Sequence, residues 1–275
     1  MTVVLLTGDG PEHRYVANRL FDRVELGLIM VETGLVLTGA QRRAQLRRRY
    51  SLPQLASRAA LAAYKRAIGD EAAATAAMAR VLGDDGRYRR YDELVAEVPT
   101  VNRPEAHELM ERVNPSRILV YGTGIVGDRM LARSAKTPLN MHTGISPHYR
   151  GSACAFWPIH NGEPDMVGAT VHEICSIIDG GPIYATAHAE LQPDDDLHAV
   201  FARAVVAGAE IYADVAADLA GHDGDRSGRP QDLTVGTEYR AHMRGLRAEW
   251  RARRRLRNGL LDGAEPRGSA PDEIS

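Results

Sequence analysis

The first part of the chain alternates between short apolar runs and a helical pattern. Residues 3–6 form an apolar, β-branched run, residues 7–10 read Thr-Gly-Asp-Gly, and apolar side chains then recur at helical spacing at Tyr15, Val16 and Leu20. A second apolar run covers residues 24–32. Two buried strands joined by a helix pair in parallel, because the helix carries the chain back to the starting edge of the sheet. The pattern therefore predicts an α/β fold with an open, mainly parallel sheet.

This pattern is interrupted and then resumes. Residues 41–49 are basic, and residues 51–82 are rich in alanine and other helix formers, with Ser51 as a candidate cap. We interpret residues 41–92 as a helical insertion. Residues 98–103 read as a loop, a short helix follows and ends near Asn114, and residues 117–121 read as a buried strand.

The second half of the chain ends in helices. Residues 167–174 and 182–191 are β-rich segments on either side of an Asp-Gly-Gly turn, which is typical of a hairpin. Residues 194–221 begin with acidic capping candidates and continue as an amphipathic pattern that ends at Gly221. We therefore expect one domain over residues 1–221. Residues 222–275 are expected to form a linker and an Arg-rich helical extension, with a frayed tail from residue 263.

Composition excludes several classes of protein. The 275 residues carry a formal net charge of −2, which gives no general attraction to nucleic acid or to a membrane. No apolar run approaches the roughly 20 residues that span a bilayer, and the start lacks the pattern of a secretion signal. We therefore expect a cytoplasmic protein. The spacings of Cys154, Cys175 and the histidines are unlike those of metal ligands, so we expect no metal site and two cysteines that serve in packing.

Two polar groups of residues stand out. The segment LNMHTGISPHYRG, residues 139–151, contains Asn140 and His142, and Asp179 lies at the tip of the predicted hairpin in SIIDGGPI. An isolated Asn-x-His is most simply a polar connection. If the strand at residues 117–121 is central, however, Asn140 and His142 lie in a loop near the carboxyl ends of the strands, where open α/β sheets bind ligands. The apolar residues before Asp179 are expected to raise its pKa towards neutrality.

These three side chains have the chemistry of direct acyl transfer to an amine. An amide stabilises a developing oxyanion, an imidazole adds a second donor or carries a proton, and a carboxylate orients the imidazole or accepts a proton. No nucleophilic serine or cysteine is required. The combination therefore indicates an enzyme, provided that the fold brings the three residues together.

The same segments resemble the folate-dependent formyltransferases. The family pattern is Asn-x-His, a proline a few residues later, Arg/Lys-Gly, and an Asp-x-Gly much further on; here it reads LNMHTGISPHYRG and then SIIDGGPI. The resemblance covers residues 117–191 well, and the helical insertion and the C-terminal segment poorly. It implies a Rossmann-like sheet and 10-formyltetrahydrofolate as the formyl donor. In motif, the chain is closest to the sugar-nucleotide and natural-product N-formyltransferases.

The resemblance also implies roles for individual residues. Asn140, His142 and Asp179 become the catalytic trio, with Asp179 holding His142 protonated or helping to remove the amine proton. The folate would lie between two loops, contacting Tyr121, Gly122, Gly124, Ile125, Ile178 and Asp179. The loop after His142 would face the acceptor, which makes Thr143, Gly144, Tyr149, Arg150 and Gly151 the substrate-binding residues.

The acceptor is the least constrained part of this interpretation. The family's common Ser-Leu-Leu-Pro reads Thr-Gly-Ile-Ser-Pro here, and its Asp-Thr-Gly reads Asp-Gly-Gly. We expect a small primary amine, with a nucleotide-linked amino sugar first and an amino-acid-derived amine or glycinamide ribonucleotide next. A formyltetrahydrofolate hydrolase and a folate-binding protein without turnover are the rival interpretations.

Three further features bear on partners. The Thr-Gly-Asp-Gly turn could cradle a phosphate, but Pro11 and Glu12 favour a purely structural turn. The Arg-rich segments at residues 42–49 and 240–257 are typical of solvated faces or oligomer contacts. A homo-oligomer therefore stays among the expected partners. The tRNA enzymes of this family carry a C-terminal β-barrel, whereas the residues after Gly221 read as helix and tail, which argues against a nucleic-acid substrate. The extension or the insertion is instead expected to help recognise the acceptor.

Overall fold

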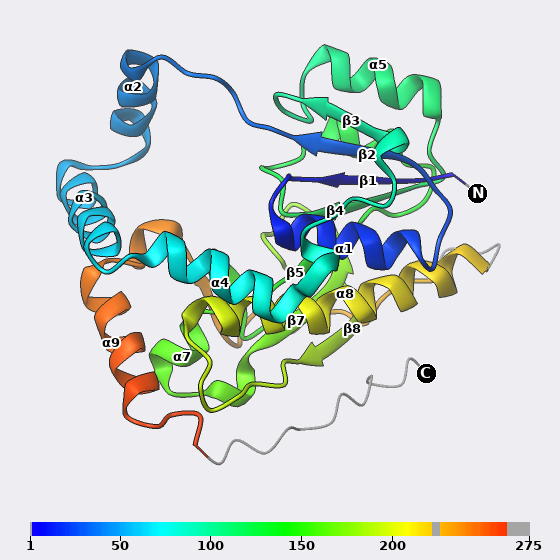
Figure 1. Cartoon of the computed structure of the whole chain (residues 1–275). Helices are drawn as coiled ribbons and strands as arrows, with labels where there is room; N and C mark the ends of the chain where they lie inside the picture. Colours follow the sequence, from blue (N-terminus) through cyan, green and yellow to red (C-terminus); the bar gives the residue numbers. More distant parts are fainter. Residues whose placement is uncertain (1, 222–225, 263–275) are drawn as a thin grey trace.

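A seven-stranded sheet forms the centre of the computed structural model, which describes residues 2–221 and 226–262 (Figure 1). Five neighbouring strands are parallel, and the last two are antiparallel to their neighbours, which confirms the predicted mainly parallel α/β sheet and the hairpin after residue 167. In spatial order the strands are β3 (Val95–Val98), β2 (Leu26–Glu32), β1 (Val3–Thr7), β4 (Arg117–Tyr121), β5 (Leu139–His142), β7 (Gly168–Glu173) and β8 (Ile183–His188).

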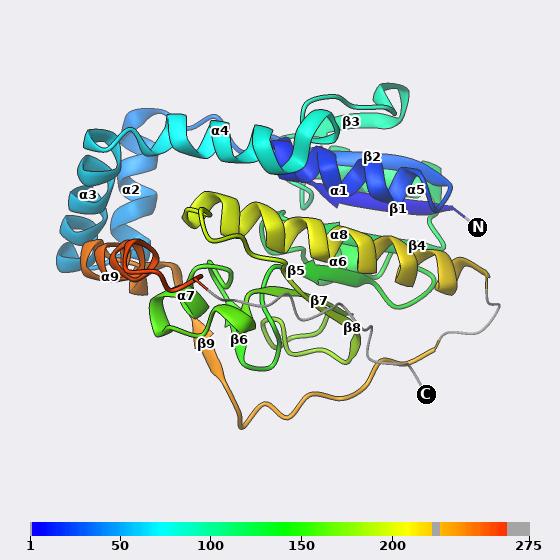
Figure 2. The same cartoon turned by 60° about the horizontal axis from the view of Figure 1, so that its bottom comes forward.

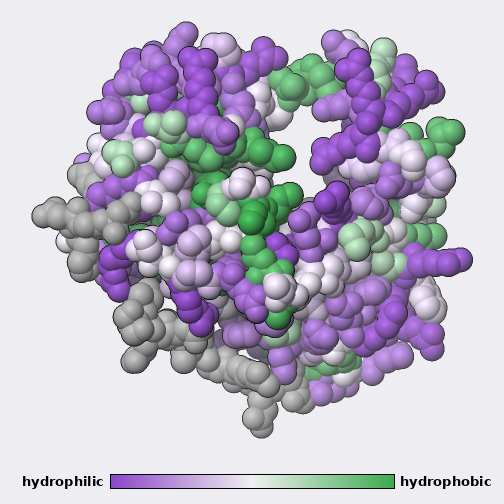
Figure 3. Space-filling view, turned by 180° about the vertical axis from the view of Figure 1, so that it is seen from behind, coloured by the Kyte–Doolittle hydropathy of each residue, from purple (hydrophilic) through white to green (hydrophobic). Residues whose placement is uncertain are grey.

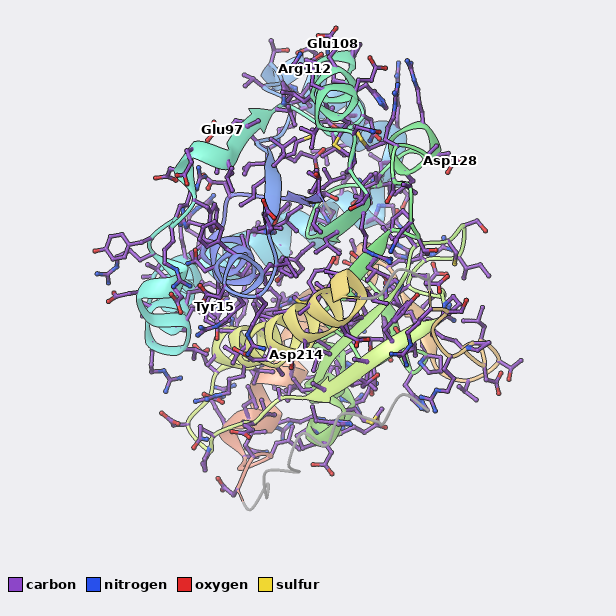
Figure 4. All side chains as sticks on the ribbon, turned by 90° about the vertical axis from the view of Figure 1, so that its right-hand side faces the viewer. Tyr15, Glu97, Glu108, Arg112, Asp128 and Asp214 are labelled. Carbon is purple, nitrogen blue, oxygen red and sulfur yellow. The ribbon has the colours of Figure 1, made fainter. Side chains whose placement is uncertain are left out.

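Helices cover both faces of this sheet. On one face lie α1 (Pro11–Phe21), α4 (Asp70–Leu82) and α8 (Leu197–Gly221), and on the other lie α5 (Pro104–Val113) and α6 (Asp128–Leu131). Figure 4 shows the layers edge-on, with Glu108 and Arg112 on the outer side of α5 and Asp214 on the outer side of α8. Side chains of a strand alternate between faces, so in β1 Leu5 packs towards α1 and α8 while Leu6 packs towards α5.

Two details of the prediction need correction. The edge strand β3 was not predicted: it ends where the segment read as a loop begins, and only four residues, Val-Ala-Glu-Val, pair with β2. The segment read as a loop around Asn140 contains β5. The long closing helix is confirmed, and the Asp196 carboxylate caps its start by accepting hydrogen bonds from the backbone N–H groups of His198 and Ala199.

The residues predicted as a helical insertion divide into a buried and an exposed part. α4 packs on α1 and α8, whereas α2 (Gly39–Arg49) and α3 (Leu52–Ala67) form an arm that stands away from the sheet (Figures 1 and 2). No residue of this arm is buried. The carboxyl ends of β1 and β2 point towards the arm (Figure 1). Seen from behind, an opening separates the arm from the body, with apolar surface along its edge (Figure 3).

The C-terminal segment packs against the domain. β9 (Thr237–Tyr239) pairs in parallel with β6 (Tyr149–Gly151), and α9 (Leu246–Arg257) packs on α7 (Trp157–Asn161) and on α3. Ala252 and Leu261 share a hydrophobic cluster with Trp157 and the start of α8. Four short 3₁₀ helices complete the described elements, at Gly83–Gly86, Asp92–Leu94, Pro164–Met166 and Ala241–Met243. The predicted tail from residue 263 lies outside the described residues.

Candidate active site

Strand β5 carries two of the three predicted catalytic residues on one face. Leu139 and Met141 point into the core beneath α8, where the Met141 side chain lies beside Gly208. By the alternation of a strand, Asn140 and His142 project from the opposite face. Both residues were expected in a loop at the end of the sheet. Their position in a paired strand fixes their separation and direction more rigidly than a loop would.

His172 lies directly across from Asn140 on the neighbouring strand β7. Its Nδ1 is 2.8 Å from the carbonyl oxygen of Glu173, so Nδ1 carries the proton and Nε2 has a free lone pair. That Nε2 accepts a hydrogen bond from the Asn140 amide nitrogen at 3.1 Å. The bond fixes the amide and leaves the second N–H of Asn140 available. No motif in the sequence singled out His172, because its pairing with Asn140 depends on the strand register.

Asp179 approaches these residues from the loop between β7 and β8. Its Oδ2 lies 3.4 Å from His142 Nδ1, and its Oδ1 lies 3.5 Å from His172 Nε2. Oδ2 also accepts a 2.7 Å hydrogen bond from the backbone N–H of Gly151. The backbone at Asp179 is left-handed, with φ of 49°, which aspartate tolerates better than most residues. At Gly181 a Cβ would meet the Glu173 carbonyl oxygen at 1.9 Å, so the turn needs glycine there.

The pKa of Asp179 departs from the expectation of a raised value. Burial does favour the neutral acid, but the charges of His142 and His172 in their protonated forms, together with the Gly151 N–H, outweigh burial and lower the pKa to about 2. Asp179 is therefore a carboxylate at neutral pH. The apolar pair Ile177 and Ile178, on which the expectation rested, is largely exposed and does not enclose the carboxyl group.

His142 is held in one orientation by the backbone. Its Nε2 lies 3.0 Å from the carbonyl oxygen of Tyr149, which can only accept, so Nε2 carries the proton in the neutral ring. Burial lowers the pKa of His142, and the nearby charge of Asp179 only partly opposes this effect. Gly144 leaves room for the contact, because a Cβ there would lie 2.4 Å from His142 Nε2. A neutral His142 therefore presents the Nδ1 lone pair beside Asp179.

The C-terminal segment supports this arrangement through β6. Tyr149 and Gly151 contact His142 and Asp179 by their backbone groups, while β9 pairs along the same strand. The Tyr239 ring stacks between the rings of Tyr149 and Trp157, at centroid distances of 5.6 and 4.5 Å. The extension thus holds the strand that orients the histidine and the carboxylate, in addition to any contact with an acceptor.

Removal of the Tyr239 ring is expected to affect both stability and turnover. Tyr239→Ala leaves a gap between two aromatic rings and is expected to lower the free energy of unfolding by about 2–3 kcal/mol. Because β6 then loses its support, we expect kcat to fall more than the acceptor KM rises. Tyr239→Phe keeps the stack and is the matched control. Thermal melts and steady-state kinetics of both variants test this, and a change confined to acceptor KM would indicate that the extension only contacts the acceptor.

The residues expected to bind folate lie in two loops near Asn140. Val120 of β4 pairs with Asn140, so the chain from Tyr121 onward continues beside it. In that loop Gly122 and Gly124 are exposed, as is Ile125, and Ile178 is exposed in the loop that carries Asp179. The Tyr121 ring itself is buried, 5.1 Å from the ring of His13. The two loops thus expose backbone groups and the apolar side chains of Ile125 and Ile178.

Two residues outside the family motif hold the loop after β4. Glu32, at the end of β2, accepts hydrogen bonds from the backbone N–H groups of Gly124 at 2.7 Å and Val101 at 3.2 Å. Asn102 accepts from Gly127 N–H and donates to the Ile125 carbonyl oxygen. An acidic residue at this place in an α/β sheet commonly binds a ribose. Here the Glu32 carboxylate is used to fix the loop.

The residues expected to bind the acceptor follow His142 in the chain. Thr143 and Gly151 are partly exposed, and Gly144 is buried against His142. The Tyr149 side chain points into the aromatic cluster, where its hydroxyl donates to Glu163, so its contact with the catalytic residues is through its carbonyl group. Arg150 is buried in β6.

The Thr-Gly-Asp-Gly turn is filled by a side chain of its own helix. His13 Nδ1 lies 3.2 Å from the Thr7 hydroxyl, and a Cβ at Gly8 would meet the His13 ring at 2.9 Å. The His13 side chain therefore occupies the turn, in agreement with the structural role favoured for it.

Two other features are absent from the described part of the chain. No group of three or more His, Cys, Asp or Glu residues that could hold a metal ion occurs among residues 2–221 and 226–262. Over the same residues, no helix is long and apolar enough to cross a membrane. Cys154 is buried, as expected of a packing residue, and burial raises the pKa of its thiol. Cys175 is exposed, so the expected packing role is wrong for that residue.

Comparison with known sequences identifies a family. The sequence model of the family described as formyl transferase matches residues 54–216, which include Asn140, His142 and Asp179. Among curated proteins, the chain is 27% identical over 139 residues to methionyl-tRNA formyltransferase of Thermotoga neapolitana. That alignment covers 50% of this chain and 44% of the relative, so the chain matches less than half the length of that protein.

Comparison with solved structures extends over more of the chain. A sugar N-formyltransferase from a Shewanella species has a TM-score of 0.54 at 14% identity, and the match covers 93% of this chain and 87% of that one. A 4-N formyltransferase from Francisella tularensis has a TM-score of 0.55 at 12% identity, covering 92% and 87%. At such low identity these matches show a shared fold.

Proposed function

Because this chain belongs to the formyl transferase family, we propose that it transfers a formyl group from 10-formyltetrahydrofolate to a primary amine of a small molecule. The observation that carries the proposal is the convergence of Asn140, His142 and Asp179, from two strands and a loop, into one cluster. The exposed apolar side chains Ile125 and Ile178, in the loops beside this cluster, fit a flat pteridine ring.

The geometry supports a role for His142 and Asp179 in proton transfer. Bound 10-formyltetrahydrofolate supplies the formyl carbon, and its N10 leaves with a proton. An amine that attacks this carbon must lose a proton, and the Nδ1 lone pair of neutral His142 is placed to accept it. The carboxylate of Asp179, 3.4 Å away, stabilises the imidazolium that results. The proton can then pass to the leaving nitrogen, so no proton is gained or lost overall.

The geometry also supports a role for Asn140 in oxyanion stabilisation. His172 takes one N–H of the amide, so the second points in a direction set by that bond. A donor fixed before the reaction stabilises the oxyanion without the cost of reorienting during the reaction. We therefore assign stabilisation of the oxyanion to Asn140 and acceptance of the amine proton to His142. Asp179 stabilises the resulting imidazolium, and His172 positions Asn140.

For the acceptor we propose a nucleotide-linked amino sugar. The loop sequences HTGISPHYRG and DGGPI support this choice because they resemble enzymes of sugar and natural-product pathways. Structures with this fold over most of the chain include one described as a sugar N-formyltransferase, which is a reason to test amino sugars first. The match to methionyl-tRNA formyltransferases covers under half of those proteins, and it makes a charged tRNA the necessary comparison.

A panel of amines tests the proposal. Wild-type protein and 10-formyltetrahydrofolate are incubated with nucleotide-linked amino sugars, amino acids, glycinamide ribonucleotide or methionyl-tRNA, and the N-formyl product is identified by mass spectrometry. We expect a formylated amino sugar and no formate release in the control without amine. Rapid formate release in that control would indicate a hydrolase. Folate binding with no product from any amine would contradict the proposal.

The pH dependence of His142 provides an independent prediction. Burial lowers the pKa of His142 below its ordinary value of 6.5, while the carboxylate of Asp179 raises it, so the ring is expected to titrate below pH 6.5. Removal of the carboxylate in Asp179→Asn deletes the raising effect, so the His142 pKa should fall further. NMR titration of the imidazole carbon-bound protons measures both values. A higher His142 pKa in the variant would contradict the assigned electrostatics.

A further inference from the structure

Arg150 is a buried cation that has no anionic partner among residues 2–221 and 226–262. The residue is 7% exposed, and the one hydrogen bond it makes there runs from Nε to the Pro147 carbonyl oxygen at 3.3 Å. A guanidinium has five N–H donors, so the four at its two terminal nitrogens are unused. Burial of a charge without a partner costs several kcal/mol. An anion bound from outside the chain would therefore neutralise the Arg150 guanidinium and use its free N–H donors.

Two buried carboxylates in the structure are treated differently. Asp195 forms ion pairs with Arg80 and Arg203, and Glu249 forms ion pairs with Arg244 and Arg253. The fold thus neutralises its buried carboxylates with its own arginines and does not do so for Arg150.

The position of Arg150 places such an anion close to the reacting groups. It lies in β6 between Tyr149, whose carbonyl holds His142, and Gly151, whose N–H holds Asp179. Because strand side chains alternate, Arg150 points away from the aromatic cluster that contains Tyr149. Arg150 therefore extends from the strand whose backbone groups hold His142 and Asp179.

We propose that Arg150 binds a phosphate or carboxylate of the acceptor, so that the protein selects amines that carry an anionic group. This inference rests on the proposed function and specifies its substrate class. An amine whose proton passes to His142 lies beside β6, and Arg150 extends from the same strand. A guanidinium recognises phosphate and carboxylate through paired hydrogen bonds. Neutral amines would leave the buried charge uncompensated and are therefore poor acceptors.

The test uses pairs of acceptors that differ in the anion alone. One pair is a nucleotide-linked amino sugar and the free amino sugar, and the other is an amino acid and its amide. Arg150→Gln is expected to raise KM for the anionic member by about 10- to 100-fold, the range of one charged hydrogen-bond pair, and to change KM for the neutral member far less. Arg150→Lys should restore part of the preference. Arg112→Gln, on the exposed outer side of α5, is the matched surface control.

Several outcomes would overturn the inference. Equal losses for anionic and neutral acceptors would show a structural role for Arg150. A rise in KM for 10-formyltetrahydrofolate alone would assign the guanidinium to the carboxylates of the folate. Titration calorimetry with uridine diphosphate and with succinate separates this inference from the proposed reaction: binding of either that weakens in Arg150→Gln supports the anion site even if no amine is formylated, and absence of binding by both counts against it.

Discussion

Asp179→Asn is expected to lower kcat for formyl transfer by about a thousandfold, within the range usual for loss of an acid–base group. The substitution keeps the shape of the side chain and removes its charge. His142 then loses the carboxylate that lies 3.4 Å from Nδ1, so the imidazolium formed on proton transfer is no longer stabilised. The acceptor KM should change little, because the charge acts during the reaction.

The control for this variant is Asp194→Asn. Asp194 is an exposed aspartate that pairs with Arg80 on the surface, so its neutralisation changes net charge equally and should leave kcat unchanged. Near-wild-type kcat in Asp179→Asn, with intact folate binding, would remove Asp179 from the mechanism. A loss of folding in this variant is recognised by its thermal melt.

Asn140→Ala is expected to lower kcat by about 100- to 1,000-fold, as removal of one oxyanion donor does in other acyl-transfer enzymes. The amide is held by His172, which in turn donates to the Glu173 carbonyl oxygen, so its free N–H is fixed before substrate binds. Asn140→Asp should be at least as damaging, since it replaces the donor with a charge that repels the oxyanion.

Tetrahydrofolate affinity distinguishes the two explanations for such a loss. If Asn140 acts only on the oxyanion, the variants bind tetrahydrofolate as the wild type does. A parallel loss of affinity would show that Asn140 shapes the folate site. Asn258→Ala, at the exposed end of α9, is the matched control for loss of a surface amide.

Local patterns in the sequence predicted much of the fold. Alternating apolar runs and helical spacing predicted β1, α1 and β2, and the Asp-Gly-Gly turn predicted the hairpin of β7 and β8. The edge strand β3 was missed because four residues carry too little periodicity. The pairing of β9 with β6 was also missed, because strands separated by more than 80 residues leave no local signal of their pairing.

The candidate site was predicted only where chemistry and sequence motif coincide. Asn140, His142 and Asp179 stand in recognisable patterns, and the structure brings them together. His172 and Tyr239 act through contacts that depend on strand register, so no spacing in the chain points to them. The prediction of a raised pKa for Asp179 was wrong for a similar reason. Its apolar neighbours in sequence are exposed, and the groups that lower the pKa come from β5, β6 and β7.

Transfer of a labelled formyl carbon tests the central claim most directly. In a single turnover, 10-formyltetrahydrofolate carrying ¹³C in its formyl group is mixed with the protein and the best acceptor of the panel, and the label is followed by NMR. Our account predicts that the label moves to an N-formyl amide of the acceptor, at a rate that depends on acceptor concentration and collapses in Asp179→Asn. Appearance of the label as formate, at a rate independent of the amine, would contradict it.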